Sequence, residues 1–229
     1  MQYYDRQTPS ILIHSPNCLL EEPFKQLQFI SPDFPAKIAS NLKDSFLLDL
    51  ALAAHQAETR LQFLYYYQVL EYAAFYFLDY EVRNKLLKII ATPDIHSDPE
   101  KYLSRLFDAM TDIKQSDEAK IVKVVETLCL PEIIWKEIEN NLPFFSKRQE
   151  FAGGFVIEPF ISENITLETF TNMWIPKTPD SLRKIRNALV HSRENRQGLL
   201  ISPSRENDLK IRPWTSLIRR IAEQIIIYA

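Results

Sequence analysis

Glycine is scarce in this sequence, with only 3 glycines among 229 residues. The phosphate-binding loops of dinucleotide folds and P-loop NTPases need several glycines at fixed spacing, and the only close pair, Gly153-Gly154, is not followed by Gly-Lys-Ser/Thr. An all-β protein with many tight turns would also need more glycine. Because 46% of the residues are hydrophobic and 12% are aromatic, we expect a globular, mostly helical protein instead.

Cysteine and long apolar runs are also scarce. The two cysteines, Cys18 and Cys129, form no C-x-x-C pair, so neither a disulfide framework nor a zinc ribbon is expected. Residues 1–10 contain no basic region followed by an apolar one, and no stretch of about 18 apolar residues follows later. The sequence therefore predicts a soluble, cytoplasmic protein with no membrane partner, no metal site and no cofactor.

Charge is unevenly distributed along the chain. The total is -3, but residues 176–229 hold eleven basic and five acidic side chains, which gives this part a net charge of +6. A basic segment on an acidic body can bind a polyanion locally, or it can be an ordinary solvated helical surface. Charge alone leaves both interpretations open.

Prolines and apolar spacing predict an all-α organisation. Residues 1–35 hold five prolines, and we expect them to form an irregular N-terminal arm that packs on the body. Residues 36–229 are expected to form one helical domain, with an irregular insertion at about 142–177 that contains one short strand pair. The predicted helices begin after Pro35, near Glu58 (running to about Ile90), at Asp98-Pro99, near Ser116, at Pro131, at Thr178-Pro179 (running to about Arg193) and near Pro213.

The helix that begins near Glu58 is the most distinctive of these. Nine of the eighteen residues from Phe63 to Tyr80 are aromatic, and apolar side chains occur on nearly all sides. A helix of this kind is normally buried on several sides. We expect most of these rings in the core of a bundle, with some surplus available for a subunit interface.

One segment, residues 181–194, places three chemically useful groups on one edge of a helix. Asn187 and His191 are about 40° apart, and the long side chain of Arg186 reaches the same edge, with Arg183 one turn earlier. An imidazole can take the proton from a ribose 2'-OH, and a guanidinium can stabilise charge on the phosphoryl oxygens. The spacing also fits an ordinary surface helix with a histidine near its carboxyl end, so spacing alone does not decide.

The same residues resemble a known signature. Arg186-Asn187-Ala-Leu-Val-His191, followed by Ser192-Arg193-Glu194, resembles the Arg-polar-x3-His motif of the HEPN superfamily. The aromatic stretch from Phe63 to Tyr72 is similar to the long helix of HEPN proteins, especially the ApeA-like anti-phage defence branch. The resemblance covers about residues 40–229, and neither the N-terminal arm nor the insertion has a counterpart in it.

The resemblance implies a HEPN-like helical bundle that acts as a metal-independent endoribonuclease, a hydrolase that leaves a 2',3'-cyclic phosphate. Arg186 and His191 would be the catalytic pair, Asn187 would be the polar position, and Glu71 would be an acid near the site, unless it is simply a helix-surface or helix-pairing glutamate. Such proteins work as homodimers, as toxins or abortive-infection effectors that cut RNA such as tRNA, and often have an antitoxin or another defence partner.

RNA would lie along the basic edge formed by Arg183, Arg186 and Arg193. Two alternatives stay open: a non-catalytic interaction protein, and an RNA- or nucleotide-binding module without turnover.

Overall fold

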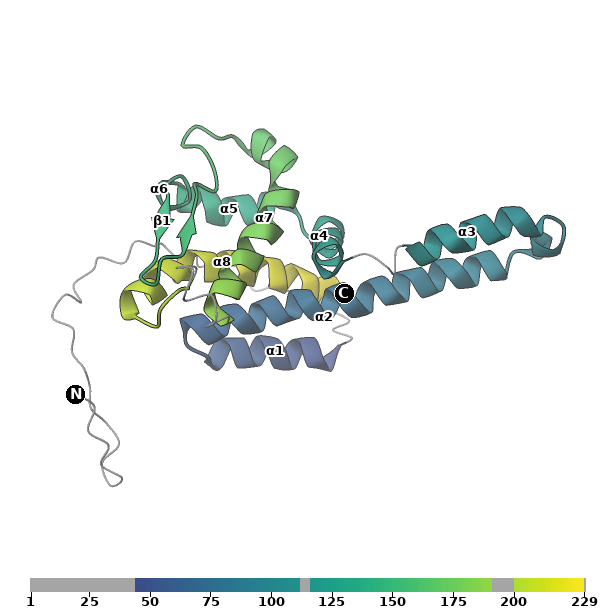
Figure 1. Ribbon diagram of the computed structural model, residues 1–229, viewed down its shortest axis with the longest axis horizontal. Coiled ribbons are helices and arrows are strands. Elements are labelled where there is room, and N and C mark those ends of the chain that lie inside the picture. The colour runs from purple at the N-terminus through teal and green to yellow at the C-terminus, as the bar shows by residue number, and fades with distance from the viewer. Residues whose placement is uncertain (1–43, 112–115, 191–199, 229) are drawn as a thin grey trace, which may run out of the picture.

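The computed structural model describes residues 44–111, 116–190 and 200–228. These residues form a mostly helical protein, as predicted (Figure 1). The predicted arm at residues 1–35 lies outside the described residues. The elements are α1 (Ser45–Gln56), α2 (Thr59–Ile90), η1 (Pro93–His96), α3 (Pro99–Thr111), α4 (Asp117–Leu128), α5 (Pro131–Asn140), α6 (Leu142–Phe145), β1 (Gln149–Glu150), β2 (Val156–Ile157), α7 (Leu167–Val190) and α8 (Arg205–Tyr228).

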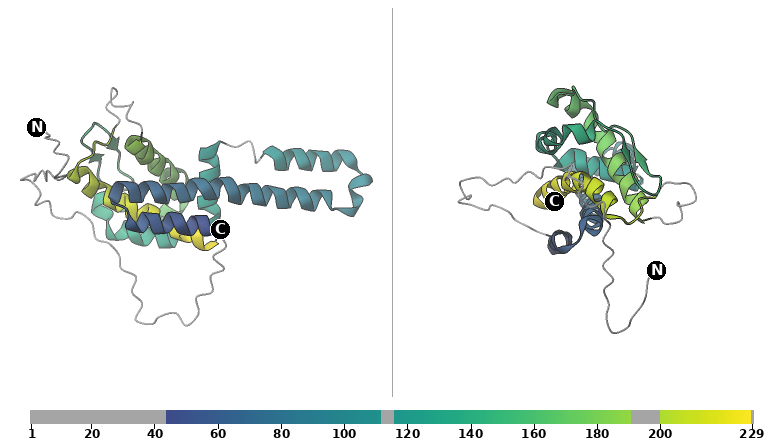
Figure 2. Two further views of the ribbon diagram at one scale, coloured as in Figure 1. Left: turned by 90° about the horizontal axis from the view of Figure 1, so that it is seen from below. Right: turned by 90° about the vertical axis from the view of Figure 1, so that its left-hand side faces the viewer.

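Helix α2 is the axis of the molecule. Its 32 residues span about 48 Å, and α1, α4 and α8 all pack against it. Only the first half of α2 lies within this body. The second half leaves the body and pairs with α3 in a projecting helical hairpin, as Figure 1 and the left view of Figure 2 show.

Side chains of α2 become more exposed at the point where the helix leaves the body. Phe63, Tyr66 and Tyr67 are buried in the core, as expected for the aromatic helix. Phe75 and Tyr76 are more than half exposed, so α2 also carries aromatic rings outside the core.

The start of α1 is fixed by Asp44. One oxygen of its carboxylate accepts hydrogen bonds from the backbone N–H groups of Phe46 (2.9 Å) and Leu47 (3.4 Å), which is an N-cap. The other oxygen accepts a hydrogen bond from the Tyr72 hydroxyl of α2 at 2.8 Å. Because Asp44 itself has an extended backbone, α1 begins at Ser45 and does not run on continuously from a helix starting after Pro35.

The irregular insertion is shorter than predicted. Residues 142–145 form α6, and α7 begins at Leu167, eleven residues before the predicted start at Thr178. Pro176 and Pro179 lie inside α7, where each removes a backbone hydrogen bond. Burial of Phe170 and Trp174 on the first turns of α7 offsets this cost. The expected strand pair is present, as β1 pairs antiparallel with β2.

The predicted start of α8, near Pro213, also lies too late in the sequence. It begins at Arg205, and Pro213 lies in its interior next to the buried Trp214. Tertiary burial again outweighs the local preference of proline for a first turn.

Residues 200–202, which we call the return segment, are held by hydrogen bonds on several sides. The backbone of Leu200 pairs with Gly153, and the Ile201 N–H donates to the Ala188 carbonyl of α7 at 3.1 Å. The Arg60 guanidinium donates to the carbonyls of Ile201 (2.6 Å) and Ser202 (2.7 Å). The chain is therefore fixed on both sides of residues 191–199, by α7 before them and by the return segment after them.

Candidate functional site

Arg183, Arg186 and Asn187 of the predicted site lie in the carboxyl-terminal part of α7, where this helix crosses α2 and α4. Leu182 and Ile185 are fully buried and attach this part of α7 to the core. Arg186 and Asn187 follow directly and are only partly buried. The spacing of the apolar residues thus turns the polar edge of α7 toward α2.

Three contacts fix the Arg186 side chain. One terminal nitrogen donates a hydrogen bond to Glu71 Oε1 of α2 at 2.8 Å, and the other donates to Asn187 Oδ1 at 3.1 Å. The guanidinium carbon also lies 5.6 Å from the centre of the Tyr67 ring, within cation–π range. Arg186 is therefore held in one orientation before any ligand binds.

These residues line a cavity of about 450 Å³ between α2, α4 and α7. Four residues named from the sequence meet there: Glu71, Arg183, Arg186 and Asn187. The remaining lining residues are Tyr67, Ala74, Phe75, Asp117, Glu118, Lys120 and Ile121. Three basic and three acidic side chains line the cavity, so its formal charge is zero.

Glu71 pairs two helices, which is one of the roles that the sequence left open for it. It is 40% exposed, yet its carboxylate pairs with Arg186, which is 31% exposed. The sequence separation of 115 residues means that only the packing of α7 on α2 creates the pair. It joins the two helices that form the walls of the cavity.

Arg183 is also engaged in ion pairs. Its guanidinium contacts Glu118 at 3.0 Å and Asp180 at 2.9 Å, and Lys184 contacts the same Asp180 at 2.7 Å. The hydrogen bond to Asp180 raises the pKa of Arg183. Any anionic ligand at Arg183 would therefore compete with two carboxylates.

Tyr67 and Phe75 are cavity residues that the sequence reasoning did not single out. Burial, followed by the charge of Glu71, raises the pKa of Tyr67 to about 12, so its hydroxyl stays protonated at neutral pH. The Lys120 ammonium lies 5.7 Å from the centre of the Phe75 ring. Residues 67, 71, 74 and 75 share one face of a helix, and this spacing relative to Glu71 was the signal that could have identified them.

His191 and Arg193, the other two predicted site residues, lie outside the described residues. Helix α7 is described up to Val190, the residue before His191. The structure thus brings together the arginine, the amide and the carboxylate of the predicted site.

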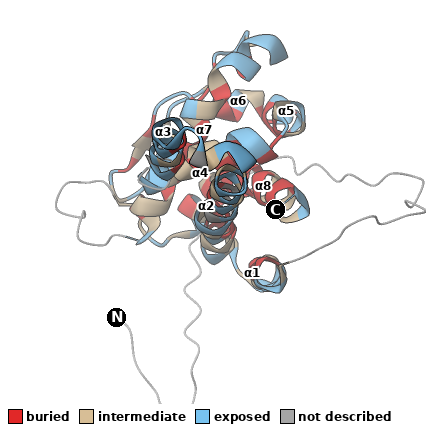
Figure 3. Ribbon diagram, turned by 90° about the vertical axis from the view of Figure 1, so that its right-hand side faces the viewer, coloured by how far each residue is buried: buried red, intermediate tan, exposed pale blue. Residues whose placement is uncertain are grey.

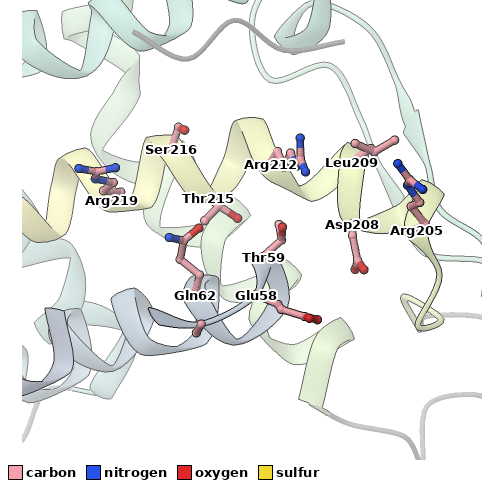
Figure 4. Close-up of a pocket in the computed structure, with 11 residues that line it drawn as sticks. Glu58, Thr59, Gln62, Arg205, Asp208, Leu209, Arg212, Thr215, Ser216 and Arg219 are labelled. Atoms are coloured by element: carbon pink, nitrogen blue, oxygen red, sulfur yellow. The ribbon is translucent and has the colours of Figure 1, made fainter. Parts of the chain in front are cut away.

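A second cavity, of about 530 Å³, lies on the opposite side of α2, between the start of that helix and α8 (Figure 4). Arg205, Arg212 and Arg219 line it at seven-residue steps along one face of α8, about 10 Å apart. Its hydroxyl groups come from Thr59, Thr215 and Ser216.

Two of the charges around this second cavity are paired. Asp208 is bound by Arg60 at 3.0 Å, and Arg219 contacts Glu223 at 2.7 Å. Because Gln62 and Glu71 are nine residues apart on α2, the two cavities face in opposite directions.

Among the residues that the structure describes, no group of three or more His, Cys, Asp or Glu side chains is placed to hold a metal ion. No helix in the described ranges combines the length and apolarity needed to cross a bilayer. Comparison of the chain with models of known protein families, with curated proteins and with solved structures found no match.

Proposed function

We propose that this protein is a metal-independent endoribonuclease of the HEPN type, and that the cavity around Arg186 is its active site. The observation that carries the proposal is the immobilised arginine: Glu71, Asn187 and Tyr67 hold the Arg186 guanidinium at the wall of a 450 Å³ cavity. A preorganised cation at that place suits a reaction in which negative charge builds up on a phosphoryl group.

The donor count of Arg186 supports this role. A guanidinium has five N–H groups, and the contacts with Glu71 and Asn187 use two of them. The other three remain for two phosphoryl oxygens, so a phosphate can bind without breaking the contacts that orient the side chain. Tyr67, protonated at neutral pH, adds a neutral hydroxyl donor to the cavity.

The proposed reaction is attack by the ribose 2'-oxygen on the adjacent phosphorus. His191, five residues after Arg186, accepts the 2'-OH proton, while Arg186 stabilises the charge on the phosphoryl oxygens. A bond forms between the 2'-oxygen and phosphorus, and the bond from phosphorus to the 5'-oxygen breaks. The 5'-oxygen takes a proton from a protonated imidazole, which leaves a 2',3'-cyclic phosphate and a 5'-OH.

We further propose that the working unit is a homodimer. One motif supplies one histidine, whereas the reaction needs a base and an acid, and a two-fold axis would bring a second His191 to the same RNA. In the cell we expect a cytoplasmic toxin or abortive-infection effector that cuts RNA such as tRNA and is restrained by an antitoxin or another defence partner. The resemblance supports this biological role.

Cleavage by the purified chain tests the enzyme. We expect cleavage of total RNA that persists in EDTA, and a loss of about 10²-fold or more in rate for Arg186→Ala and His191→Ala. Arg148→Ala is the matched control, because Arg148 is an exposed arginine paired with Glu150 and Glu158 in the irregular region. Full activity in both motif variants, or a strict Mg²⁺ requirement with 5'-phosphate products, would contradict the proposal.

The second candidate function is RNA or nucleotide binding without turnover. The row of three arginines beside the hydroxyl groups of the second cavity favours it (Figure 4). In that case the chain binds labelled RNA without cutting it, and Arg212→Ala weakens binding more than Arg186→Ala. Fluorescence polarisation at two salt concentrations measures this.

A further inference from the structure

One aromatic side chain of the Arg186 cavity is open to solvent. Phe75 lines this cavity and is 59% exposed, whereas Tyr67, which lines it about two turns earlier on α2, is only 3% exposed. Phe75 follows Glu71 by four residues, so it lies about 6 Å farther along the same side of α2 as the carboxylate that binds Arg186. Figure 3 looks toward the body along the hairpin and shows exposed positions of α2 and α4 in pale blue.

Two neighbouring side chains contact the Phe75 ring. The Tyr76 ring meets it edge to face, with ring centres 5.0 Å apart and planes at 76°. The Lys120 ammonium of α4 lies 5.7 Å from its centre, which is a cation–π contact. Because more than half of Phe75 remains exposed, a flat ligand can still reach the ring.

The charged groups of the cavity differ in how far they are paired. Glu71 pairs with Arg186 at 2.8 Å, and Glu118 pairs with Arg183 at 3.0 Å, so two of the three acids are already neutralised by neighbours. The Lys120 ammonium, by contrast, forms no ion pair within the part of the chain that the structure describes. Its charge is therefore available for an anionic ligand at the same side of the cavity as Phe75.

This charge favours a nucleic acid over a protein surface as the partner of Phe75. An apolar protein surface that covered the ring would also remove Lys120 and Arg186 from water, which is costly unless an anion accompanies it. A polynucleotide carries one phosphate with every base. A base can therefore cover the ring while the phosphates on either side of it meet the two cations.

We propose that Phe75 stacks on an unpaired RNA base next to the phosphate that Arg186 binds, and that Lys120 binds an adjacent phosphate of the same strand. In a duplex each base is paired and covered by its neighbours, so only an unpaired base can be splayed onto a protein ring. Every base has a π-face, so Phe75 selects the unpaired state and not one particular base. This inference rests on the proposed nuclease function, in which Phe75 determines specificity and transfers no proton.

Binding of RNA that cannot be cut tests the stack separately from cleavage. The probe is a short labelled oligonucleotide whose 2'-OH groups are all methylated, either single-stranded or annealed to its complement, and fluorescence polarisation measures its affinity in EDTA. Phe75→Ala should weaken binding of the single strand about 5- to 150-fold, the range for loss of one base–aromatic stack, and should leave duplex binding unchanged. Phe75→Tyr keeps the ring and should keep the affinity. Phe107→Ala is the matched control, because Phe107 is 64% exposed but lies on α3, outside the cavity.

Salt dependence tests the role of Lys120, and cleavage tests the place of the stack. Lys120→Gln should lower the slope of log affinity against log salt concentration by about one, as expected for the loss of one phosphate contact. With an RNA hairpin that holds one bulged nucleotide, the unmodified chain should cut at the bulge. Phe75→Ala should lower kcat/KM there by about the factor lost in binding and leave its pH profile unchanged, because no titrating group is removed.

Three outcomes would overturn the inference. The first is unchanged single-strand affinity in Phe75→Ala, and the second is an equal loss for single strand and duplex. The third is a dimer, seen by light scattering, that Phe75→Ala dissociates without changing RNA affinity, because the ring then belongs to a protein interface. Full cleavage by both Arg186→Ala and His191→Ala contradicts the nuclease proposal instead, and the binding comparison still decides whether Phe75 stacks on a base.

Discussion

Replacing Gly153 by alanine tests how strongly the return segment is held. Gly153 has a φ of 111°, a conformation that residues with a Cβ atom rarely adopt, and its carbonyl accepts a hydrogen bond from the N–H of Leu200. A Cβ atom at this position would lie 2.3 Å from the Leu200 carbonyl oxygen and 2.7 Å from Ser202 Oγ. Because the nearest atom belongs to the backbone, the return segment must move.

The cost of this substitution has two parts. The unfavourable backbone conformation costs about 1–3 kcal/mol. Movement of the return segment strains or breaks the hydrogen bonds Leu200 N–H to Gly153 and Ser202 N–H to Ala152, each contributing about 0.5–1.5 kcal/mol. We therefore expect a loss of about 3–5 kcal/mol in the free energy of unfolding, a large fraction of the total for a domain of this size.

Urea denaturation followed by circular dichroism measures the effect. With a slope of about 2–3 kcal/mol per M, the midpoint of Gly153→Ala should fall by about 1–2 M. Gly154→Ala, at a φ of 89°, controls for the cost of the positive φ itself and should lower the midpoint less. A Gly153→Ala protein within about 0.5 kcal/mol of the unmodified one would refute the argument that this contact fixes the return segment.

Three further predictions concern single side chains. Asp44→Ala should destabilise the protein by about 1–2 kcal/mol in thermal melts, because it removes both an N-cap and the hydrogen bond to Tyr72. The control Asp98→Ala removes only a cap contact on α3 and should destabilise the protein less. Burial raises the pKa of Glu137 more than Arg220 lowers it, so folding stabilises the protonated form of its carboxyl group. The free energy of unfolding, relative to that of the Glu137→Gln variant, should be highest below about pH 4.3 and should fall as the pH rises through the folded pKa. A difference between the two proteins that stays constant in urea titrations from pH 4 to pH 8 would contradict this. Burial raises the pKa of the Cys129 thiol to about 12, so iodoacetamide at pH 8 should label Cys129 slowly in the native protein and rapidly in denaturant, as read by mass spectrometry.

Local signals in the sequence predict several helix starts correctly. Helices α3 and α5 begin at prolines in the first turn, and α4 begins after the Ser116 cap. The starts of α7 and α8 were wrong because Pro176, Pro179 and Pro213 carry the same local signal. Inside these helices, burial of neighbouring residues outweighs the lost backbone hydrogen bond, and that burial depends on contacts far away in the sequence.

The candidate site, like the helix starts, could be predicted from the sequence only in part. Arg183, Arg186 and Asn187 lie on one helix, so their common edge follows from spacing alone. The partnership of Arg186 with Glu71 and Tyr67 depends on which side of α2 meets α7. Since α2 is aromatic on nearly all sides, its sequence does not distinguish the side that faces the cavity from the side that faces solvent.

The unbroken course of α2 has a mechanical consequence. No glycine or proline interrupts Thr59–Ile90, so Glu71 and Ile90 belong to one stiff rod and are separated by about 28 Å along it. A tilt of about 2° about the half of α2 that is held in the body therefore moves Ile90 by about 1 Å, whereas Glu71, close to the pivot, keeps its 2.8 Å contact with Arg186. A force on the outer end of the hairpin thus acts with a lever arm of about 28 Å on the part of α2 that α1, α4 and α8 hold.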